Sequence, residues 1–266
     1  MECDLSNDLP GRNEVKLFVV PLDVSAGEYA ACEQTLNAEE LTRANRFVFA
    51  DVRRRFVVCR GQLRRVLAQA LNQQPGELRF RYEQWGKPRL ELNVEPPIHF
   101  NVSHSGEWAL IALAHSPLGV DLEVLNDRIS YRAIASQILT CREIQLWDHL
   151  SLSERAVAAM QLWVCKEALL KAMGLGIAEG LQQVSFPLPI PKDVAFAPAH
   201  IDGQLYMHVE DNGSCRTNHW IDAASWQLRM LDLVPNSYAA ICTPRSIDRL
   251  SILRVDYPIF GNISPG

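Results

Sequence analysis

Apolar and polar residues follow two spacings along this chain, and each spacing predicts one kind of secondary structure. Alternating apolar residues or short apolar runs predict strands at 15–24, 77–84, 107–114, 119–125, 183–186, 204–210, 226–233 and 237–243. Apolar residues three or four positions apart predict helices at 39–48, 51–72, near 131–150 and at 154–174, with Asp51 as the N-cap of the second helix. The pattern indicates a protein of mixed helices and strands.

One part of this pattern occurs twice. Residues 57–80 resemble residues 163–186 at a constant offset of 106 residues, and both copies indicate a helix, a glycine-containing loop and a strand. A shorter match pairs 108–112 with 238–242. We interpret these matches as an internal duplication. The expected fold class is therefore α+β, with two similar pseudo-duplicated lobes. Each lobe is expected to have a small, mainly antiparallel sheet with a long packed helix, and the active site is expected at the lobe interface.

The duplication also sets the expected domain bounds. We expect an N-terminal lobe at 1–118 and a C-terminal lobe at 119–244, joined by the turn-rich residues 116–119. Residues 245–266 contain Pro, Asn and Gly and are expected to form a C-terminal tail that wraps the surface.

Composition and charge narrow the class of protein. The chain has 266 residues, of which 48% are hydrophobic, so it can bury a large core. Its formal net charge of −5 argues against general attraction to nucleic acid or anionic membranes. The seven cysteines include no Cys-x-x-Cys pair, so we expect reduced, mostly buried thiols. Because no secretory signal or membrane-spanning run is apparent, we expect a cytoplasmic protein, as a monomer with an internal pseudo-twofold axis.

Two acidic residues on the strand at 119–125 are the first candidates for chemistry. Asp121 and Glu123 alternate with apolar residues, so both carboxylates lie on one face of the strand. The usual explanation for such a pair is the solvated face of an antiparallel strand. However, the corresponding strand of the first copy, at 15–19, has no paired acids. We therefore expect one acidic site per chain.

The helix of the second copy adds a third carboxylate. Trp163, Glu167 and Lys171 lie at i, i+4 and i+8 along one helix face, whereas the position matching Glu167 in the first copy is Gly61. An exposed Glu-Lys pair is the simplest interpretation. Together with Asp121 and Glu123, however, Glu167 could complete an oxygen-ligand set for a hard cation such as Mg²⁺.

Residues 99–108 indicate an extended segment followed by a polar turn. Ser103 and Ser105 carry hydroxyl groups, His104 carries an imidazole, and Gly106 permits close backbone approach, which together suit phosphate oxygens. A lone histidine is more often structural. The sequence does not match the Gly-x-Ser-x-Gly nucleophile motif.

Basic residues supply the remaining candidates. Eight arginines lie on or just before the helix at 51–72, namely Arg43, Arg46, Arg53, Arg54, Arg55, Arg60, Arg64 and Arg65. Most are expected on a solvated basic face, but one or two near the helix start could clamp a phosphate. Lys87, in the turn Gly86-Lys87-Pro88, could contact the same anion.

Four motifs, in this order, resemble one family. They are Trp-Gly-Lys-Pro at 85–88, Phe-Asn-Val-Ser-His-Ser at 100–105, Gly-Val-Asp-Leu-Glu at 119–123 and Trp-x-x-Lys-Glu-Ala-x-x-Lys-Ala-x-Gly-x-Gly at 163–176. Over about residues 14–243 the chain resembles the surfactin-type (Sfp-type) phosphopantetheinyl transferases. The last two motifs are specific, and the first is weak on its own.

The resemblance implies an activity and its partners. The family transfers 4′-phosphopantetheine from coenzyme A, the co-substrate, to a serine of an apo acyl or peptidyl carrier protein, with Mg²⁺, and releases adenosine 3′,5′-bisphosphate. By position, the implied metal ligands are Asp121, Glu123 and Glu167. Lys171 is implied to hold the pyrophosphate and assist the leaving group. We further expect Glu167 to take the serine proton, directly or through a metal-bound water molecule.

The resemblance also implies contacts to coenzyme A, namely Arg55, Lys87, Ser103, His104 and Lys171. Lys87 matches a lysine beside the adenine nucleotide, and Arg55 most nearly matches an arginine at the 3′-phosphate. The neighbouring Arg53 and Arg54 leave that choice ambiguous. Two upstream lysines of the family are missing, and Glu40 and Arg43 stand near their positions, so coenzyme A affinity is where this chain is expected to differ.

Two alternatives remain open from the sequence. One is another Mg²⁺-dependent phosphotransferase or nucleotide hydrolase that uses the same three acids, and it predicts nucleotide turnover without coenzyme A. The other is a non-catalytic module that binds carrier proteins or nucleotides. A carrier protein, being acidic, would need a local basic or apolar docking patch, which we place near residues 125–150.

Overall fold

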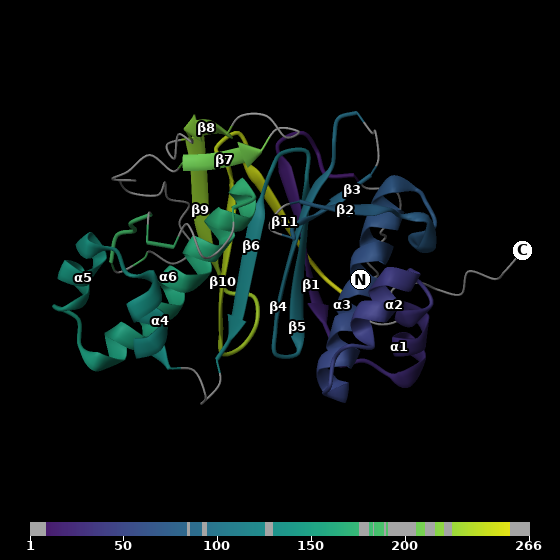
Figure 1. The fold of residues 1–266 in the computed structure, drawn as a ribbon, viewed down its shortest axis with the longest axis horizontal. Coiled ribbons are helices and arrows are strands. Elements are labelled where there is room, and N and C mark those ends of the chain that lie inside the picture. Colours follow the sequence, from purple (N-terminus) through teal and green to yellow (C-terminus); the bar gives the residue numbers. More distant parts are fainter. Residues whose placement is uncertain are drawn as a thin grey trace, which may run out of the picture.

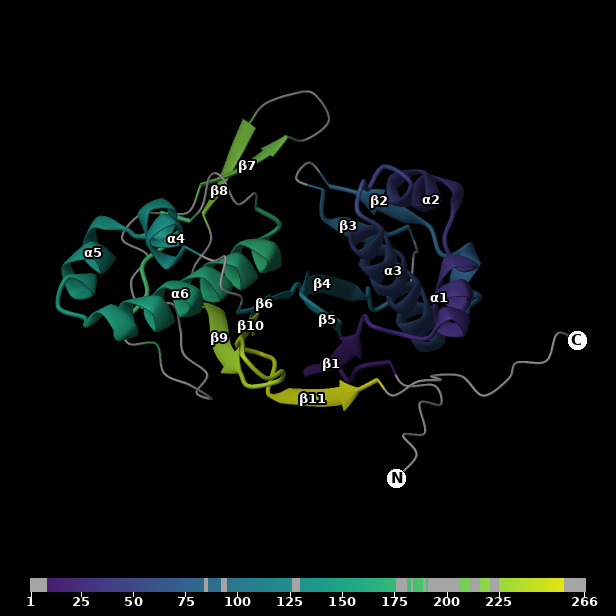
Figure 2. The same ribbon diagram turned by 90° about the horizontal axis from the view of Figure 1, so that it is seen from below.

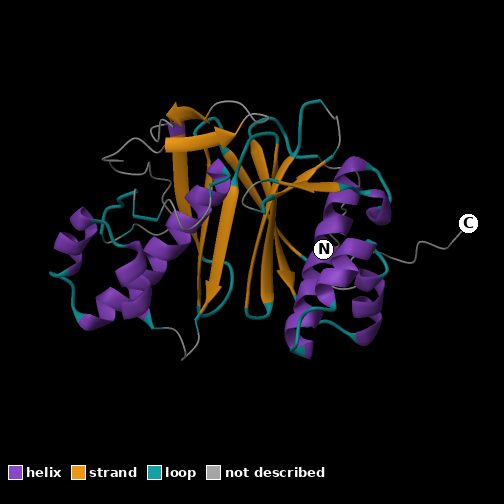
Figure 3. Cartoon of the chain, in the orientation of Figure 1, coloured by secondary structure: helices purple, strands orange, loops and turns teal. Residues whose placement is uncertain are grey.

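Two β-sheets occupy the middle of the molecule, with helices on both outer sides (Figure 1; Figure 3). The computed structural model describes residues 9–83, 86–91, 95–125, 130–175, 181–182, 184–188, 190, 206–210, 216–220 and 225–255, with 206–210 and 216–220 described as backbone only.

The elements follow one order, which is used twice. The first set is β1 (Glu14–Pro21), α1 (Ala26–Glu33), α2 (Ala38–Ala44), α3 (Ala50–Leu71), the 3₁₀ turn η1 (Pro75–Glu77), β2 (Phe80–Tyr82), β3 (Pro88–Leu90), β4 (His99–Ser105) and β5 (Trp108–Ala114). The second set is β6 (Gly119–Val124), α4 (Tyr131–Ile138), α5 (Cys141–Trp147), α6 (Leu152–Met173), β7 (Tyr206–Glu210), β8 (Arg216–Trp220), β9 (Trp226–Leu231) and β10 (Ser237–Pro244), followed by β11 (Arg249–Arg254). Each set runs strand, two short helices, one long helix, hairpin and two strands.

The strand order repeats as well. The first sheet has the order β11-β1-β5-β4, and the second has the order β6-β10-β9. In both sheets, the first strand of the set lies beside the last strand, and the last strand lies beside the second-to-last strand. Within each of these triplets the strands are antiparallel. The predicted α+β fold with two pseudo-duplicated lobes is confirmed.

The long helices show which residues of the two copies correspond in the structure. α3 and α6 both have 22 residues and both end at a residue in the left-handed conformation, Asn72 and Gly174. These helix ends are 174 − 72 = 102 residues apart. The sequence match used an offset four residues longer, which is about one helical turn, so the same helix face was matched but one turn out of register.

Three apolar clusters explain the layers. One side of β1, with Phe18 and Val20, packs under α1 and α3. The other side, with Leu17 and Val19, packs against the second sheet in a cluster that both lobes share. The far side of the second sheet packs under α6. Both sheets are therefore buried on both faces, and the molecule is layered as helices, sheet, sheet and helices.

The expectation of a surface tail after residue 244 is wrong for β11. This strand pairs in parallel with β1, in a register that joins Leu250 to Val15 and Leu253 to Phe18. Leu253 packs onto the first lobe's core, and Leu250 packs onto the cluster that both lobes share. The chain therefore crosses back to complete the first lobe's sheet.

Several local predictions also need correction. Asp51 lies in the first turn of α3, but the N-cap is Phe49 and makes no side-chain cap bond. Residues 184–186 are not a strand. The expected polar turn at 103–106 is mostly strand, because β4 runs to Ser105 and the turn begins at Gly106, which has a φ of +58°.

Among the described residues, no helix is both long and apolar enough to cross a membrane. The described cysteines are free thiols. Four of them are buried, Cys32, Cys59, Cys165 and Cys242, and Cys141 is exposed. This agrees with the expected reduced thiols, while Cys3 and Cys215 lie outside the described residues.

Candidate active site

The first strand of the second lobe carries the paired acids at the seam between the lobes. Gly119 lies so close to α6 that a Cβ atom there would come within 2.0 Å of the Ala168 carbonyl oxygen. This close approach brings the C-terminal half of α6 over the face of β6 that bears Asp121 and Glu123. Figure 2 shows α6 running from the outer edge of its lobe toward β4 and β6. Asp121 is 3% exposed, so a solvated strand face does not explain the pair.

Asp121 is held by a lysine and a serine. Lys171 Nζ lies 2.6 Å from Asp121 Oδ1, and Ser103 Oγ donates to the same oxygen at 2.8 Å. Lys171 Nζ also lies 3.3 Å from Ser103 Oγ. The other oxygen, Asp121 Oδ2, is buried and has no hydrogen-bond partner among the described residues. Asp121 thus keeps one carboxylate oxygen open.

Glu123 is held on both oxygens by neutral donors. Ser105 Oγ donates to Oε2 at 2.9 Å, and Trp163 Nε1 donates to Oε1 at 3.2 Å. Burial and the charge of Asp121 raise the pKa of Glu123, while the two donors and Lys171 act in the opposite direction. The two donors therefore fix where this carboxylate points and favour its charged form.

Glu167 completes the predicted acidic set. It is 3% exposed, and its Oε1 has no hydrogen-bond partner among the described residues. Burial raises its pKa to about 7; Lys171 lowers it, and Asp121 and Glu123 raise it. The mutual effects show that the three acids and the lysine, predicted from separate motifs, share one site.

Within the part of the chain that is described, no group of three or more His, Cys, Asp or Glu side chains is arranged so that it could hold a metal ion. Here the positive charge beside Asp121 is the Lys171 ammonium. Assignment of the three acids as metal ligands therefore stays a prediction. The chemistry of the donor set fits a hard cation, because Asp121 Oδ2 and Glu167 Oε1 are buried oxygens that no described residue bonds.

β4 reaches the second lobe through its side chains. β4 and β6 are both edge strands of their sheets and run beside each other. Three β6 amides donate to β4 side chains: Val120 N to Asn101 Oδ1 at 2.9 Å, Leu122 N to Ser103 Oγ at 3.2 Å, and Val124 N to Ser105 Oγ at 3.0 Å. Each serine accepts from β6 and donates to an acid on it, so β4 both joins the lobes and orients the carboxylates.

The roles of Asn101 and Ser105 were missed from the sequence, although a signal existed. Asn101, Ser103 and Ser105 alternate, which is the spacing of one strand face. Because the segment was interpreted as a turn, the alternation was not used. Ser103, predicted to contact phosphate, lies at the site, but its hydroxyl is engaged with Asp121, Leu122 and Lys171.

His104 lies on the opposite face of β4 from the two serines and is exposed. Loss of hydration around the ring, and then the charges of Lys171 and Arg43, lower its pKa, while Asp121 raises it. His104 and Arg43 are therefore close enough to the acidic site to share its electrostatic field. A neutral His104 could still donate one hydrogen bond to a phosphate oxygen.

Lys87 comes from the β2–β3 hairpin of the first lobe and reaches the end of α6. Its Nζ donates to the Lys171 carbonyl at 2.5 Å and to the Leu118 carbonyl at 3.4 Å. Burial lowers the pKa of Lys87 to about 8, although the charge of Glu83 acts to raise this pKa. Lys87 is thus a cation at the helix C-terminus, where the helix dipole favours positive charge. Its motif partner Trp85 lies outside the described residues.

The arginines of α3 are mostly engaged within the first lobe. Arg53 pairs with Glu33 at 3.2 Å, Arg54 donates to the Val24 carbonyl, and Arg65 pairs with Glu28. Within the described residues, the Arg55 guanidinium makes no hydrogen bond, ion pair or ring contact. Of Arg53, Arg54 and Arg55, it is the one whose guanidinium is available.

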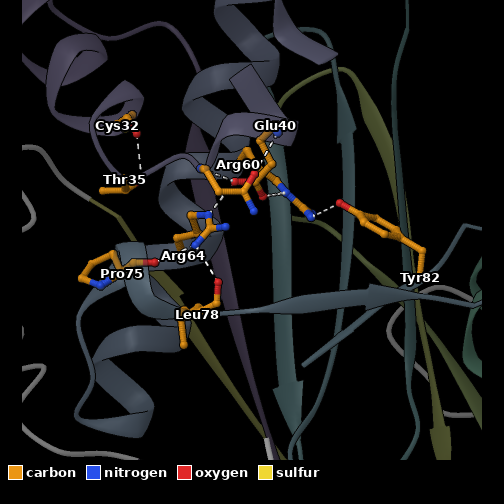
Figure 4. Close-up of polar contacts among 9 residues, drawn as sticks. Cys32, Thr35, Glu40, Arg60, Arg64, Pro75, Leu78 and Tyr82 are labelled. Carbon is orange, nitrogen blue, oxygen red and sulfur yellow. Dashed lines mark hydrogen bonds and ion pairs between the residues drawn. The ribbon is translucent and has the colours of Figure 1, made fainter. Parts of the chain in front are cut away.

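Glu40 is the ion-pair partner of two further arginines of α3. Arg60 Nε donates to Glu40 Oε1 at 2.6 Å, and Arg64 Nε donates to Oε2 at 2.7 Å (Figure 4). Arg64 also donates to the carbonyls of Pro75 and Leu78, at 2.8 and 3.0 Å. Glu40 is 3% exposed and is the anion of a buried structural cluster. A lysine at position 40 would lie beside two guanidinium groups, so a carboxylate suits this position.

Comparison with known proteins gives consistent matches over both lobes. A family model described as "4′-phosphopantetheinyl transferase, N-terminal" matches residues 23–116, and one described as "4′-phosphopantetheinyl transferase superfamily" matches residues 117–224. The chain is 38% identical to the 4′-phosphopantetheinyl transferase HetI of Nostoc sp. over 191 residues, which is 70% of this chain and 80% of HetI.

Two further relatives carry related names. A putative 4′-phosphopantetheinyl transferase of Synechocystis sp. is 35% identical over 186 residues, covering 70% of each chain. The 4′-phosphopantetheinyl transferase Sfp of Bacillus subtilis is 26% identical over 203 residues, covering 75% of this chain and 84% of Sfp.

Proposed function

The chain belongs to the 4′-phosphopantetheinyl transferase family, and on this basis we propose that it modifies apo acyl or peptidyl carrier proteins. The proposed reaction depends on Mg²⁺. In it, 4′-phosphopantetheine passes from coenzyme A to a carrier serine, and adenosine 3′,5′-bisphosphate is released. The observation that carries the proposal is the seam site, where three buried or half-buried acids meet Lys171 between two family-matched lobes.

The acids would hold the cation. Asp121 Oδ2 and Glu167 Oε1 lack partners among the described residues, and Glu123 is oriented by Ser105 and Trp163. When held by these acids, Mg²⁺ would supply positive charge that stabilises a pyrophosphate. The remaining acceptor capacity of these oxygens is what a hard cation requires.

The coenzyme A contacts follow from the positions of the basic groups. We place the pyrophosphate next to Lys171 and His104, which share the field of the acidic site. We assign the 3′-phosphate to Arg55, because Arg53 and Arg54 have partners inside the lobe. Lys87 would lie beside the nucleotide, anchored to the end of α6.

Proton transfer is assigned to Glu167. The serine oxygen forms a bond to the pantetheine-side phosphorus, the bond from that phosphorus to the bridging oxygen breaks, and the serine proton must leave. Glu167 is a buried carboxylate at the site, and its Oε1 has no hydrogen-bond partner among the described residues, so it can accept this proton. Lys171 stabilises the negative charge that develops on the departing bisphosphate.

Incubation with coenzyme A, Mg²⁺ and a panel of apo carrier proteins tests the function. Intact mass spectrometry should show the addition of one phosphopantetheine group to a carrier, and chelation of the metal should prevent it. A folded enzyme that modifies no carrier in the panel, but hydrolyses nucleotides without coenzyme A, would overturn the proposal.

The role of Glu167 has its own test. Glu167→Gln keeps the size of the side chain but cannot accept the proton, so transfer should fall at least about a thousandfold while coenzyme A binding stays largely intact. Calorimetry of coenzyme A binding separates the two effects. Retained turnover in this variant would contradict the assignment.

A further inference from the structure

One cation of the chain lies among the acids of the site. Lys171 Nζ is 2.6 Å from Asp121 Oδ1, and its charge favours the ionised forms of Glu123 and Glu167. Its side chain is 27% exposed, whereas that of Asp121 is 4% exposed, so the lysine is the more solvent-accessible member of the pair. The Lys171 ammonium group thus pairs with Asp121 and also stabilises the charged forms of Glu123 and Glu167.

The hydrogen bonds leave the acids incompletely satisfied. Asp121 Oδ2 and Glu167 Oε1 are buried without partners among the described residues, although both residues are only 3% exposed. Lys171 has one positive charge and also lies within reach of Ser103, so it cannot satisfy three carboxylates. Buried anions that lack partners are stabilised by any cation that can reach them and has a higher charge than an ammonium group.

We propose that Lys171 is a built-in counter-ion of the free enzyme, and that a divalent cation binds by displacing its ammonium group from Asp121. The displaced lysine is then available to a ligand's phosphates. This inference rests on the proposed function, because it assumes that the acids bind a divalent cation. It gives Lys171 opposite effects on two steps: it opposes binding of the cation and assists binding of the pyrophosphate.

Direct measurement of Mn²⁺ binding, without coenzyme A or carrier, tests the competition. Mn²⁺ is followed by the electron paramagnetic resonance signal of the free ion, with the full-length chain. Lys171→Met removes the ammonium and should tighten Mn²⁺ binding about tenfold or more, because Asp121 is then left unpaired. The same variant should lose transfer activity, so affinity and activity should change in opposite directions.

A matched control separates displacement from long-range charge. Arg43→Gln also removes one positive charge from the field at His104, but Arg43 is exposed and makes no contact with the acids. It should change Mn²⁺ affinity by less than about threefold. An equal gain in both variants would mean that only net charge matters and would overturn the proposal, as would unchanged or weaker binding in Lys171→Met.

Two further measurements keep the test decisive. If Lys171→Met does not fold, Lys171→Gln retains a donor of similar length and should give the same direction of change. In the unmodified protein, the labelling of Lys171 by an amine reagent should increase when Mn²⁺ is added, and constant labelling would contradict displacement. The carrier mass assay runs independently, so a failed Mn²⁺ result with successful transfer overturns this inference alone.

Discussion

At the scale of single side chains, neighbouring residues of the motif at 163–176 have different roles. Glu167 lies at the site, whereas Lys166, one position earlier, is fully buried and contacts other elements. Lys166 Nζ donates to Glu143 Oε2 at 2.7 Å and to the carbonyls of Ile138 and Leu181 at 2.5 and 2.8 Å. It joins α6 to α4, α5 and the segment at 181–186, so the lysine of this Lys-Glu pair is structural.

Lys166→Met should therefore destabilise the protein without touching the site. Removing the ammonium leaves Glu143 as a buried charge without its cation, which costs about 3–5 kcal/mol in free energy of unfolding. Urea denaturation followed by far-UV circular dichroism measures this loss. Adding Glu143→Gln to the first substitution should recover part of the stability, and a loss below about 1 kcal/mol in the single variant would contradict the structural role.

A pH dependence follows from Lys87. Because burial lowers its pKa to about 8, Lys87 is charged below that pH and becomes neutral as the pH rises through it. A neutral Lys87 attracts the anionic nucleotide less, so kcat/KM for coenzyme A should fall above about pH 8. The pH profile of kcat/KM reports the free enzyme, where this pKa applies.

Lys87→Arg provides the control for that profile. An arginine stays charged throughout the range, so the fall above pH 8 should be absent or much smaller. If the arginine variant shows the same fall, another group is responsible.

The crossing of β6 and α6 sets the geometry of the site at the scale of elements. Gly119→Ala would place a Cβ atom 2.0 Å from Ala168 O and 2.4 Å from Ala172 N, both backbone atoms. Because neither can move alone, we expect a loss of at least about 3 kcal/mol in free energy of unfolding, or a shift of α6 that reduces transfer strongly.

Gly76→Ala is the matched control, since a Cβ atom at Gly76 meets nothing within 4 Å. Thermal unfolding and the carrier assay should show this variant close to the unmodified protein. A Gly119→Ala protein with unchanged melting temperature would show that the close approach is not needed.

Much of the element order was predictable from the sequence, because apolar periodicity identifies the strands and long helices before tertiary contacts act. The proximity of Asp121, Glu123, Glu167 and Lys171 agrees with the motifs, while their roles as site residues stay predictions. The geometry of the site was not predictable from the sequence. Which groups the Ser103 and Ser105 hydroxyls bond depends on their contacts with β6, and which arginines stay free depends on partners far away in sequence. Local patterns carry no record of such contacts.

At the scale of the whole molecule, the lobes share an apolar cluster. Val15, Leu17 and Leu110 of the first lobe pack with Val120 and Ile241 of the second. The first lobe also takes its edge strand β11 from beyond the second. Neither lobe can bury its apolar surface alone, although their sequences appear as two units.

We therefore expect the fragment 1–118 not to fold alone. Its far-UV circular dichroism should show no cooperative thermal transition, whereas the full chain should unfold in one transition that far-UV signal and tryptophan fluorescence report together. Co-expression with 119–266 should restore soluble material. A dispersed amide NMR spectrum from the isolated fragment would contradict this expectation.

The pairing of β1 with β11 also has a consequence for synthesis. β1 leaves the ribosome well before its parallel neighbour, which begins at residue 249, after the second lobe has been made. At about 5–20 residues per second, the edge of β1 stays open for on the order of ten seconds. An open strand edge invites pairing with other chains. The lobe that is translated first is thus the last to be completed, and the yield of folded protein depends on how quickly translation reaches its final strand.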